Sequence, residues 1–262
     1  MALQICIGGM TGWTGSELTK AAMAAPDLKV VAGISRKSAG QMIENVPVYA
    51  DVETALKEKL CDVYIDYTHP SIAKENIFSA LNRGAAVIVG TSGLNAADYE
   101  KIHEKALERK LGVIASGNFS VTAALLQRFA LMAARHVPDV EIIDYAKAAK
   151  PDAPSGTARE LAERLGKIAP YQPAFPIEET IGPKGIRGAD VGNSRVHSVR
   201  LPGFILSVEA IFGAVGERLV LRHDAGESAK PYVAGTLLAA RRVVAMTGLI
   251  RGLDNLLFGP MD

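Results

Sequence analysis

The sequence predicts an α/β protein with two domains, one built on a parallel sheet and a central α+β domain with a mixed or antiparallel sheet. Short apolar strands alternate with helical patterns through about the first 119 residues. Beyond Val121 this alternation stops, and three later segments alternate apolar and polar residues like antiparallel strands. At 262 residues and 48% hydrophobic composition, the chain can bury two modest cores.

The first strand, Leu3–Ile7, runs into a glycine-rich turn and then the helix-like segment Ser16–Ala25. Strand, glycine turn and helix form the context of a dinucleotide-binding fingerprint, because glycines let a pyrophosphate approach the helix N-terminus. Counted from Gly9 the spacing is G-x-x-G-x-x-G, so a glycine turn without a ligand stays the alternative. We expect a Rossmann-like domain whose turn binds a dinucleotide through Gly9, Thr11, Gly12, Trp13, Thr14 and Gly15.

The second strand, Lys29–Ile34, ends in Ser35, Arg36, Lys37 and Ser38. This is where such a fold places the group that reads the adenosine ribose, and an acidic residue there binds the ribose hydroxyls. Two cations and two hydroxyls suit a 2′-phosphate better, so we expect NADPH, with NADH possible. A solvated basic turn is the alternative.

Three further strand patterns follow, Asp62–Pro70, Ala85–Val89 and Gly112–Ala115, separated by the helical patterns Ser71–Arg83 and Ala96–Lys110. Each strand ends in a small or polar loop. Each loop alone is compatible with a plain turn, but the carboxyl edge of a parallel sheet is where ligands bind. We therefore expect these loops to bind the dinucleotide as well, through Tyr67, Thr68, Gly90, Thr91, Ser92, Gly117, Asn118 and Phe119.

The central part of the chain begins with a long apolar helix, Val121–His136, and a strand, Glu141–Ala146. After a loop and a helix to about Ile168, a Pro- and Gly-rich excursion covers 170–192. The strand patterns Ser194–Arg200, Ile205–Phe212 and Arg218–Asp224 come next, and Lys230–Gly248 is apolar at helical spacing. We expect residues 1–119 with 227–262 to form the dinucleotide-binding domain, and 120–226 a domain for substrate binding and oligomerisation.

The loop between Lys150 and Ala158 combines two prolines with Ser155, Gly156 and Thr157 at the start of an amphipathic helix. A helix start offers free backbone amides and the positive end of the peptide dipole. With the Lys150 ammonium and the Ser155 and Thr157 hydroxyls, it makes a seat for a carboxylate or phosphate. An ordinary capped helix beside a solvated lysine is the alternative.

Composition restricts the possible partners. A formal net charge of +1 provides no overall field for nucleic acid or an acidic membrane surface. The longest apolar runs, such as Ala85–Val89, are too short to cross a bilayer, and Leu3–Ile7 has no charged leader before it, so we expect a cytoplasmic protein. The two cysteines, Cys6 and Cys61, lie in apolar strand patterns and are expected in the core, and no His, Cys or carboxylate spacing indicates a metal site.

Four motifs occur in the order found in one known family: Gly90–Gly93, Gly117–Ser120, Lys150–Ala158 and Gly216–His223. The chain resembles the dihydrodipicolinate reductases over nearly its full length. The resemblance implies a homotetrameric reductase of lysine and diaminopimelate biosynthesis that uses NADPH or NADH to reduce 4-hydroxy-tetrahydrodipicolinate, a small dicarboxylate. It also implies pyrophosphate contacts at Gly9, Gly12 and Gly15, the ribose phosphate at Arg36, the nicotinamide end at Thr68, Gly90, Thr91, Asn118 and Phe119, and substrate carboxylates at Lys150, Ser155, Gly156 and Thr157.

One departure concerns the proton donor. Family members usually carry a His-His pair shortly before this lysine, whereas this chain has Ala146 and Lys147, and no histidine occurs between His136 and His197. Hydride addition to a conjugated cyclic imine leaves an atom that must gain a proton. We expect Lys150, or failing that Lys147, to be the acid, with a pKa lowered if both ammonium groups face inward. A surface position is the alternative for Lys147.

A second departure is Val199–Phe204, which stands where the family usually has a Gly-Asp-bearing segment. Arg200 in this segment is a candidate second clamp for a carboxylate. A reductase of the same family acting on a different small carboxylated imine is therefore one alternative, and a non-catalytic NADP-sensing protein is another. A tyrosine-based short-chain dehydrogenase is disfavoured, because no Tyr has a Lys four residues later.

Overall fold

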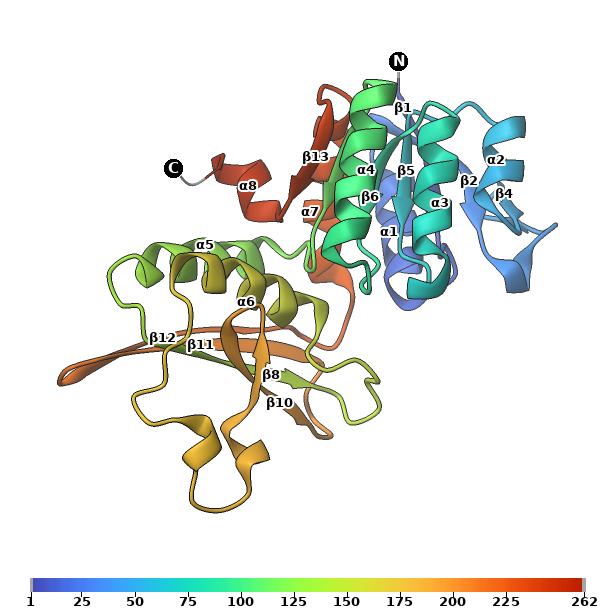
Figure 1. Ribbon diagram of the computed structural model, residues 1–262. Coiled ribbons are helices and arrows are strands. Elements are labelled where there is room, and N and C mark those ends of the chain that lie inside the picture. Colours follow the sequence, from blue (N-terminus) through green and yellow to red (C-terminus); the bar gives the residue numbers. More distant parts are fainter. Residues whose placement is uncertain (1, 261–262) are drawn as a thin grey trace. The chain divides into compact units, whose positions relative to one another are not determined.

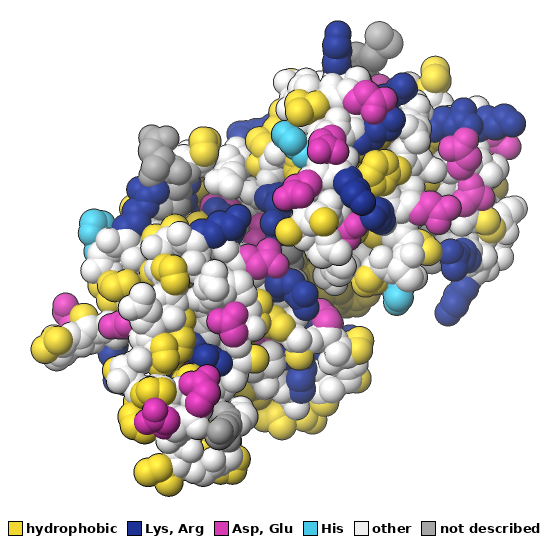
Figure 2. Space-filling model, in the orientation of Figure 1, with side chains coloured by type: hydrophobic (Ala, Val, Ile, Leu, Met, Phe, Trp, Pro, Cys, Tyr) yellow, Lys and Arg dark blue, Asp and Glu magenta, His cyan; other side chains and the backbone are white. Residues whose placement is uncertain are grey.

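The computed structural model describes residues 2–260, and the chain forms two compact units (Figure 1). Unit 1 comprises the chain up to Val121 together with the segment from Ala229 onward, and unit 2 comprises Thr122–Ser228. No helix in this described part of the chain is long and apolar enough to cross a membrane. On the face drawn in Figure 2, basic and acidic side chains are interspersed on each unit.

Unit 1 is built on an eight-stranded sheet of order β13-β7-β6-β5-β1-β2-β4-β3, in which only the β3–β4 pair is antiparallel. Its strands are β1 Leu3–Gly8, β2 Leu28–Ile34, β3 Met42–Ile43, β4 Val46–Tyr49, β5 Val63–Asp66, β6 Ala86–Val89, β7 Gly112–Ala115 and β13 Gly248–Arg251. The chain winds outward from β1 in both directions. The loops after β1, β2 and β5 therefore meet at a topological switch point, where open α/β sheets bind ligands.

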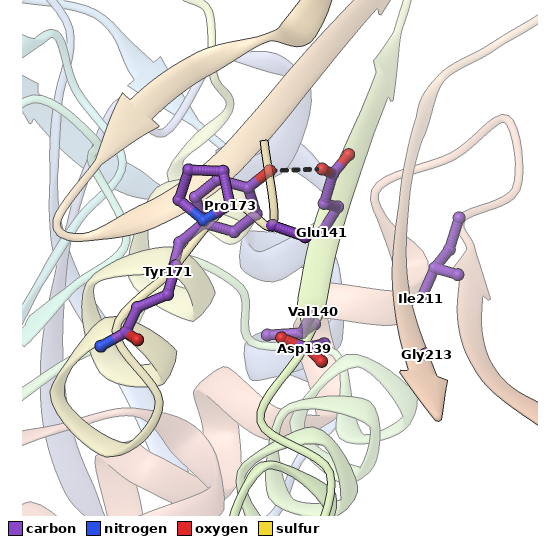
Figure 3. Close-up of a pocket in the computed structure, with 9 residues that line it drawn as sticks. Asp139, Val140, Glu141, Tyr171, Pro173, Ile211 and Gly213 are labelled. Atoms are coloured by element: carbon purple, nitrogen blue, oxygen red, sulfur yellow. Dashed lines mark hydrogen bonds between the residues drawn. The ribbon is translucent and has the colours of Figure 1, made fainter. Parts of the chain in front are cut away.

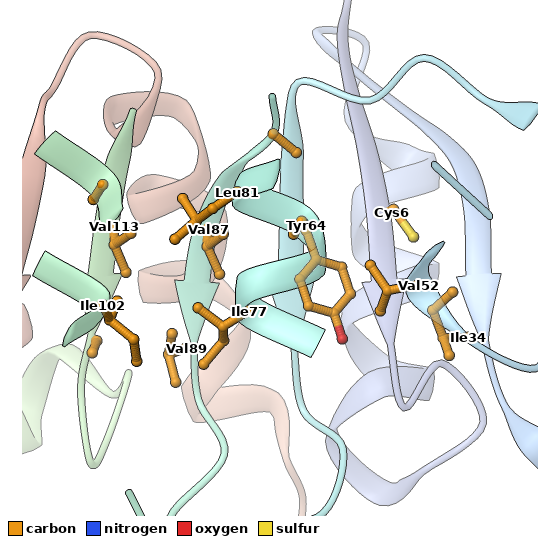
Figure 4. Close-up of a cluster of buried hydrophobic side chains, with 14 of the residues drawn as sticks. Cys6, Ile34, Val52, Tyr64, Ile77, Leu81, Val87, Val89, Ile102 and Val113 are labelled. Atoms are coloured by element: carbon orange, nitrogen blue, oxygen red, sulfur yellow. The ribbon is translucent and has the colours of Figure 1, made fainter. Parts of the chain in front are cut away.

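Helices cover both faces of this sheet (Figure 1). They are α1 Trp13–Ala24, α2 Val52–Glu58, α3 Pro70–Asn82, α4 Ala96–Arg109, α7 Lys230–Val243 and α8 Leu253–Phe258, with a 3₁₀ turn at Arg36–Ser38. Helices α2, α3 and α4 pack on one face, where Ile77, Leu81 and Ile102 meet Val87 and Val113 of the strands (Figure 4). The inner strands are buried on both faces, which explains their continuous apolar runs.

Three elements of unit 1 differ from the expected boundaries. Helix α1 begins at Trp13, inside the glycine turn rather than after it. The strand expected to reach Pro70 ends at Asp66, because Pro70 occupies the first turn of α3. The last helical pattern ends at Val243 rather than Gly248, and Gly248, with a positive φ of 87°, begins the edge strand β13 instead.

Unit 2 contains a five-stranded mixed sheet of order β12-β11-β8-β10-β9, with α5 and α6 on the same side of it (Figure 1). Its elements are α5 Val121–Ala134, β8 Val140–Ala146, α6 Gly156–Ile168, β9 Ala189–Val191, β10 Ser194–Arg200, β11 Leu206–Ala214 and β12 Glu217–Asp224. Short 3₁₀ turns, Ile177–Glu179 and Lys184–Arg187, lie in the Pro- and Gly-rich excursion. The α/β class with a parallel and a mixed sheet is thus confirmed.

Strand β10, which alternates like an antiparallel strand, has one neighbour of each kind in the mixed sheet. It runs parallel to β8, with Arg200 opposite Ala146, and antiparallel to β9. The reason is that α6 carries the chain back between β8 and β10, and a crossover through a helix joins parallel strands. This pairing places the end of β10 beside the start of the Lys150 loop.

The two cysteines differ in their surroundings. Cys6 is buried within β1, as expected for a core residue. Cys61 lies just before β5 rather than inside a strand and is only partly buried. Its thiol donates to the carbonyl of Val63 at 3.1 Å, and burial raises its pKa to about 12. Neither thiol therefore has the character of a reactive thiolate.

Candidate active site

The glycine turn after β1 is tight because two of its glycines have no room for a side chain. Gly9 has a positive φ of 73°, and a Cβ atom there would overlap the carbonyl of Tyr67. A Cβ atom at Gly15 would overlap the carbonyl of Gly9. The turn closes with a hydrogen bond from the Gly12 amide to the Gly9 carbonyl at 2.8 Å. These contacts bring the turn against the loop that follows β5.

The start of α1 is suited to an anion. Its N-cap is Gly12, which has no side chain to cap the helix, and its first turn contains no acidic residue. Thr11, Gly12 and Trp13 are exposed, and the Trp13 ring meets the edge of Tyr232 with centroids 5.9 Å apart. Uncapped amides at the positive end of a helix dipole fit a pyrophosphate without further groups. The residues present therefore fit a dinucleotide.

The end of β2 carries hydroxyls and cations and no carboxylate. The Ser35 and Thr11 hydroxyls lie 2.8 Å apart, so this loop adjoins the glycine turn. Arg36 and Lys37 are both exposed in the 3₁₀ turn that follows. Exposed guanidinium and ammonium groups next to two hydroxyls can bind a phosphate, and the ribose phosphate expected here stays a prediction.

The loops after β5 and β6 are joined by a buried carboxylate that the sequence reasoning missed. Asp66 is fully buried, and its Oδ1 accepts from the Thr68 amide at 3.1 Å, from the Thr68 hydroxyl at 2.8 Å and from the Thr91 hydroxyl. Its Oδ2 accepts from the Tyr64 hydroxyl at 2.6 Å and from Asn76 Nδ2 at 3.2 Å. Since a hydroxyl has one proton, Thr68 and Thr91 have their protons engaged by Asp66 and hold the loops in place.

The aromatic pair Tyr67 and Phe119 links the loops after β5 and β7. Their rings meet edge to face with centroids 6.3 Å apart, and the Tyr67 hydroxyl lies 2.7 Å from that of Thr236 on α7. Burial raises the pKa of Tyr67, so it is neutral. A Cβ atom at Gly90 would overlap the Tyr67 ring. Phe119 is 1% exposed, which gives it a packing role beneath the edge.

The remaining predicted residues of unit 1 lie in the same loops. Asn118 is buried, its Oδ1 accepts from the Ser120 amide at 2.8 Å, and its carbonyl accepts from the Ser116 hydroxyl at 2.8 Å. Gly117 is exposed, and Ser92 and Thr14 are half-buried. Four contacts link the loops that are expected to bind the dinucleotide, so these loops lie side by side along one edge of the sheet. The contacts are Thr11–Ser35, Gly9–Tyr67, Thr68–Thr91 and Tyr67–Phe119.

In unit 2, the Lys150 loop leads into α6 through a capped start. Ser155 is the N-cap, and its hydroxyl accepts from the Ala158 amide at 3.3 Å. Gly156 is half-buried and Thr157 is buried at the helix start. The Lys150 ammonium pairs with the Asp152 carboxylate at 2.7 Å. Lys147 is exposed, as in the surface alternative, and its carbonyl accepts from the Lys150 amide at 3.0 Å.

Arg200, the candidate second clamp, already has protein partners. Its Nη2 donates to Asp144 Oδ2 at 2.7 Å and to the Asp152 carbonyl at 2.8 Å, and its Nη1 donates to the Val199 carbonyl at 2.9 Å. Asp144 is the second functional candidate that the sequence reasoning missed. The signal was available, because Asp144 shares the inward face of β8 with Val140, Ile142 and Ala146.

A cleft of about 350 Å³ lies at the other end of β8, lined by Asp139, Val140, Glu141, Tyr171, Gln172, Pro173, Ala174, Ile211 and Gly213 (Figure 3). Burial alone would raise the pKa of Glu141, but hydrogen bonds from His197 and Tyr171 lower it. Its carboxylate lies 2.8 Å from His197 Nε2 and 3.0 Å from the Tyr171 hydroxyl. The His197 side chain is therefore bound to Glu141 near the start of β8, whereas Lys150 follows the end of that strand. Among the described residues, no group of three or more His, Cys, Asp or Glu is placed to hold a metal ion.

Comparisons with known proteins agree with this arrangement. A family model described as dihydrodipicolinate reductase, N-terminus, matches residues 3–119, and one described as dihydrodipicolinate reductase, C-terminus, matches residues 122–257. Proteins named 4-hydroxy-tetrahydrodipicolinate reductase are similar along the whole chain: that of Bacillus pumilus is 35% identical, covering 97% of this chain and 98% of its own, and that of Streptococcus pneumoniae is 37% identical, covering 98% and 100%.

A solved structure of a dipicolinate-bound dihydrodipicolinate reductase from Paenisporosarcina sp. TG-14 superposes with a TM-score of 0.80 at 30% identity, covering 98% of this chain and 100% of that one. An amine dehydrogenase from Mycobacterium smegmatis, at 13% identity and a TM-score of 0.64, shares the fold alone. Both family models and the full-length relatives lead to one conclusion: the chain belongs to the dihydrodipicolinate reductase family.

Proposed function

We propose that the protein is a 4-hydroxy-tetrahydrodipicolinate reductase that uses NADPH, with NADH as a possible second cofactor. It is an NAD(P)H-dependent oxidoreductase, in keeping with the family to which it belongs. The observation that carries the proposal is the position of the Lys150 ammonium before the capped start of α6, which we propose as a seat for an anion. In a member of this family, such a seat suits a carboxylate of the substrate.

Unit 1 would hold the dinucleotide along the edge formed by its strand ends. The uncapped start of α1 would bind the pyrophosphate through Gly9, Gly12 and Gly15 and their neighbours Thr11, Trp13 and Thr14. The loops of Tyr67, Thr68, Gly90, Thr91, Ser92, Gly117, Asn118 and Phe119 would shape the nicotinamide end. When bound, a reduced nicotinamide supplies the hydride.

The preference for NADPH rests on Ser35, Arg36 and Lys37. Two exposed cations and a hydroxyl stand where an acidic residue would bind the two ribose hydroxyls of NADH. We expect Arg36→Ala to weaken NADPH binding about tenfold and to leave NADH binding within about twofold, because only NADPH has the 2′-phosphate. Equal losses for both cofactors would place Arg36 outside the phosphate site.

The Lys150 loop would anchor the substrate. Lys150 Nζ would exchange its Asp152 partner for a substrate carboxylate, and Ser155, Gly156 and Thr157 would offer hydroxyl and amide donors. The similar reductase from Paenisporosarcina binds dipicolinate, which supports a small dicarboxylate ligand for this chain. Lys150 Nζ is also our proposed proton donor, with Lys147 second.

We further propose that residues 1–119 with 227–262 bind the dinucleotide and that 120–226 serve substrate binding and subunit assembly. The support is the division of the chain into two units and the match of separate family models to its two parts. A homotetramer in the cytoplasm, working in lysine and diaminopimelate biosynthesis, completes the proposal. Sedimentation of the purified protein tests the subunit number directly.

The function is tested by mixing purified protein with NADPH and freshly generated 4-hydroxy-tetrahydrodipicolinate and following the absorbance of the reduced nicotinamide. We expect rapid oxidation by the wild type and a loss of about 100-fold or more in kcat/KM for Lys150→Ala. Lys167→Ala, an exposed lysine in the last turn of α6, is the matched control and should keep full activity. NADPH binding without turnover would favour a non-catalytic sensor.

A further inference from the structure

Asp144 is a buried charge at the base of the proposed substrate site. It lies near the carboxyl end of β8, is 0% exposed, and points to the face of the sheet that carries Ile142 and Ala146. Its Oδ2 accepts from Arg200 Nη2 at 2.7 Å, from the Ser155 amide at 2.9 Å and from the Ser198 hydroxyl at 3.2 Å. A carboxylate so buried is stable only when paired and hydrogen-bonded.

Arg200 extends this link to the other side of the loop. The same Nη2 that contacts Asp144 also donates to the carbonyl of Asp152 at 2.8 Å. The loop is thus held at two points that flank Ala153 and Pro154: at Asp152 through Arg200, and at Ser155 through Asp144 directly. Lys150 lies two residues before the first point, and Ser155 is the N-cap of α6.

We infer that Asp144, acting with Arg200, is a positioning residue that preforms the carboxylate seat between Lys150 and the start of α6. The inference rests on the proposed function of that seat. Both arms of the seat depend on Asp144. One arm follows from the Asp152 anchor, and the other begins at Ser155, whose amide donates to Asp144 and so fixes the start of α6. A seat fixed before the ligand arrives spares the ligand the entropy of ordering the loop.

The alternative is that Arg200 contacts a substrate carboxylate directly, and the two interpretations predict opposite signs for Asp144→Asn. If Arg200 were a direct clamp, this substitution would release its guanidinium and remove a negative charge near the anion, so dicarboxylates would bind as well or more tightly. If Asp144 positions the loop, the same substitution loosens the seat and dicarboxylates bind more weakly.

The experiment measures dipicolinate binding and steady-state kinetics of the wild type and Asp144→Asn in the full-length protein saturated with NADPH. We expect the Kd for dipicolinate and the KM for 4-hydroxy-tetrahydrodipicolinate to rise about tenfold or more, with the Kd for NADPH within about twofold of wild type. Unchanged or tighter dipicolinate binding by a folded Asp144→Asn variant would overturn the inference. Ser198→Ala is the matched control, because it removes one bond to the same oxygen without touching the loop, and it should bind dipicolinate like the wild type.

If Asp144→Asn does not fold, the double variant Asp144→Asn with Arg200→Gln removes both charges and leaves no uncompensated ion. Amide hydrogen exchange of residues 150–157 in this ligand-free variant should be faster than in the wild type, and wild-type protection would overturn the inference. A wild type that neither oxidises NADPH with this substrate nor binds dipicolinate would refute the proposed function instead. Activity and dipicolinate binding in the wild type, with no loss in Asp144→Asn, would refute only the positioning role.

Discussion

The two units each place a buried aspartate near the point where a strand meets a loop that we propose to bind a ligand, but the two aspartates have different hydrogen-bond donors. Asp66 in unit 1 and Asp144 in unit 2 are both 0% exposed. Asp66 accepts only from neutral donors, namely hydroxyls, one side-chain amide and one backbone amide. Asp144 is paired with a guanidinium as well as an amide and a hydroxyl. A network of many neutral donors can lose one member, whereas an ion pair that loses its cation leaves a buried charge without a counterion.

Removing the cation should produce the largest effect. Arg200→Gln leaves the Asp144 carboxylate buried without its guanidinium, so we expect it to lower the free energy of unfolding by about 3–5 kcal/mol. Denaturant unfolding followed by circular dichroism measures this loss. Arg195→Gln, on the same strand but stacked on the Tyr171 ring at 5.0 Å, is the control and should cost less. Equal losses for the two variants would show that the ion pair has no special weight.

Neutralising the carboxylate of unit 1 should cost less. Asp66→Asn keeps the side-chain shape but turns one acceptor into a donor facing Tyr64, Thr68 and Asn76, and we expect a loss of about 1–3 kcal/mol. NADPH binding should weaken, because we propose that the Thr68 and Thr91 loops shape the nicotinamide end. Binding of 2′-phospho-ADP-ribose, which lacks nicotinamide, should be retained. Equal weakening of both ligands would mean that Asp66 supports the whole unit rather than these loops.

Removing one neutral donor to Asp66 should cost less stability than replacing Asp66 itself. Tyr64→Phe removes only the 2.6 Å hydrogen bond to Oδ2, while Asn76 still donates to that oxygen. We expect about 1 kcal/mol of lost stability and no measurable change in NADPH affinity. Thermal unfolding and a fluorescence titration with NADPH provide the two numbers. A loss as large as that of Asp66→Asn would make the network depend on Tyr64 alone.

The smallest effect concerns pH. Burial lowers the pKa of His223 in β12 below its ordinary value of 6.5, while the charge of Asp224 opposes this shift. The unfolded chain therefore binds more protons than the folded one as the pH drops through 6.5 toward the folded pKa, so stability is lost in that window. His223→Phe should flatten the pH dependence of the unfolding midpoint there. If the unfolding midpoint of His223→Phe changed with pH as steeply as that of the wild type, other groups would be responsible for the pH dependence.

Sequence patterns predicted the parts of the molecule that depend on neighbours along the chain. The strand, turn and helix around Gly9, and the helix start at Ser155, follow from glycine, proline and apolar spacing within a few residues. The same reasoning located the loops at the carboxyl edge, because consecutive parallel strands end on the same side.

What the patterns missed depends on distant pairing. Asp144 and Arg200 are 56 residues apart, and only the parallel pairing of β10 with β8 brings them together. Asp66 binds Thr91, 25 residues away on the loop after the next strand. Both aspartates interrupt apolar strand faces, which is the local sign that a buried charge needs a partner. The residue that partners each aspartate cannot be read from nearby sequence, because the pairing of distant strands and loops decides which residues meet.

The most direct test of the separate roles of the two aspartates is a pair of binding titrations on Asp66→Asn and Asp144→Asn. Each variant is titrated with NADPH, and then with dipicolinate in the presence of saturating NADPH. We predict that Asp66→Asn weakens NADPH binding and spares dipicolinate, whereas Asp144→Asn weakens dipicolinate binding and spares NADPH. If each variant weakened both ligands equally, or neither, the two buried aspartates would not serve separate ligands.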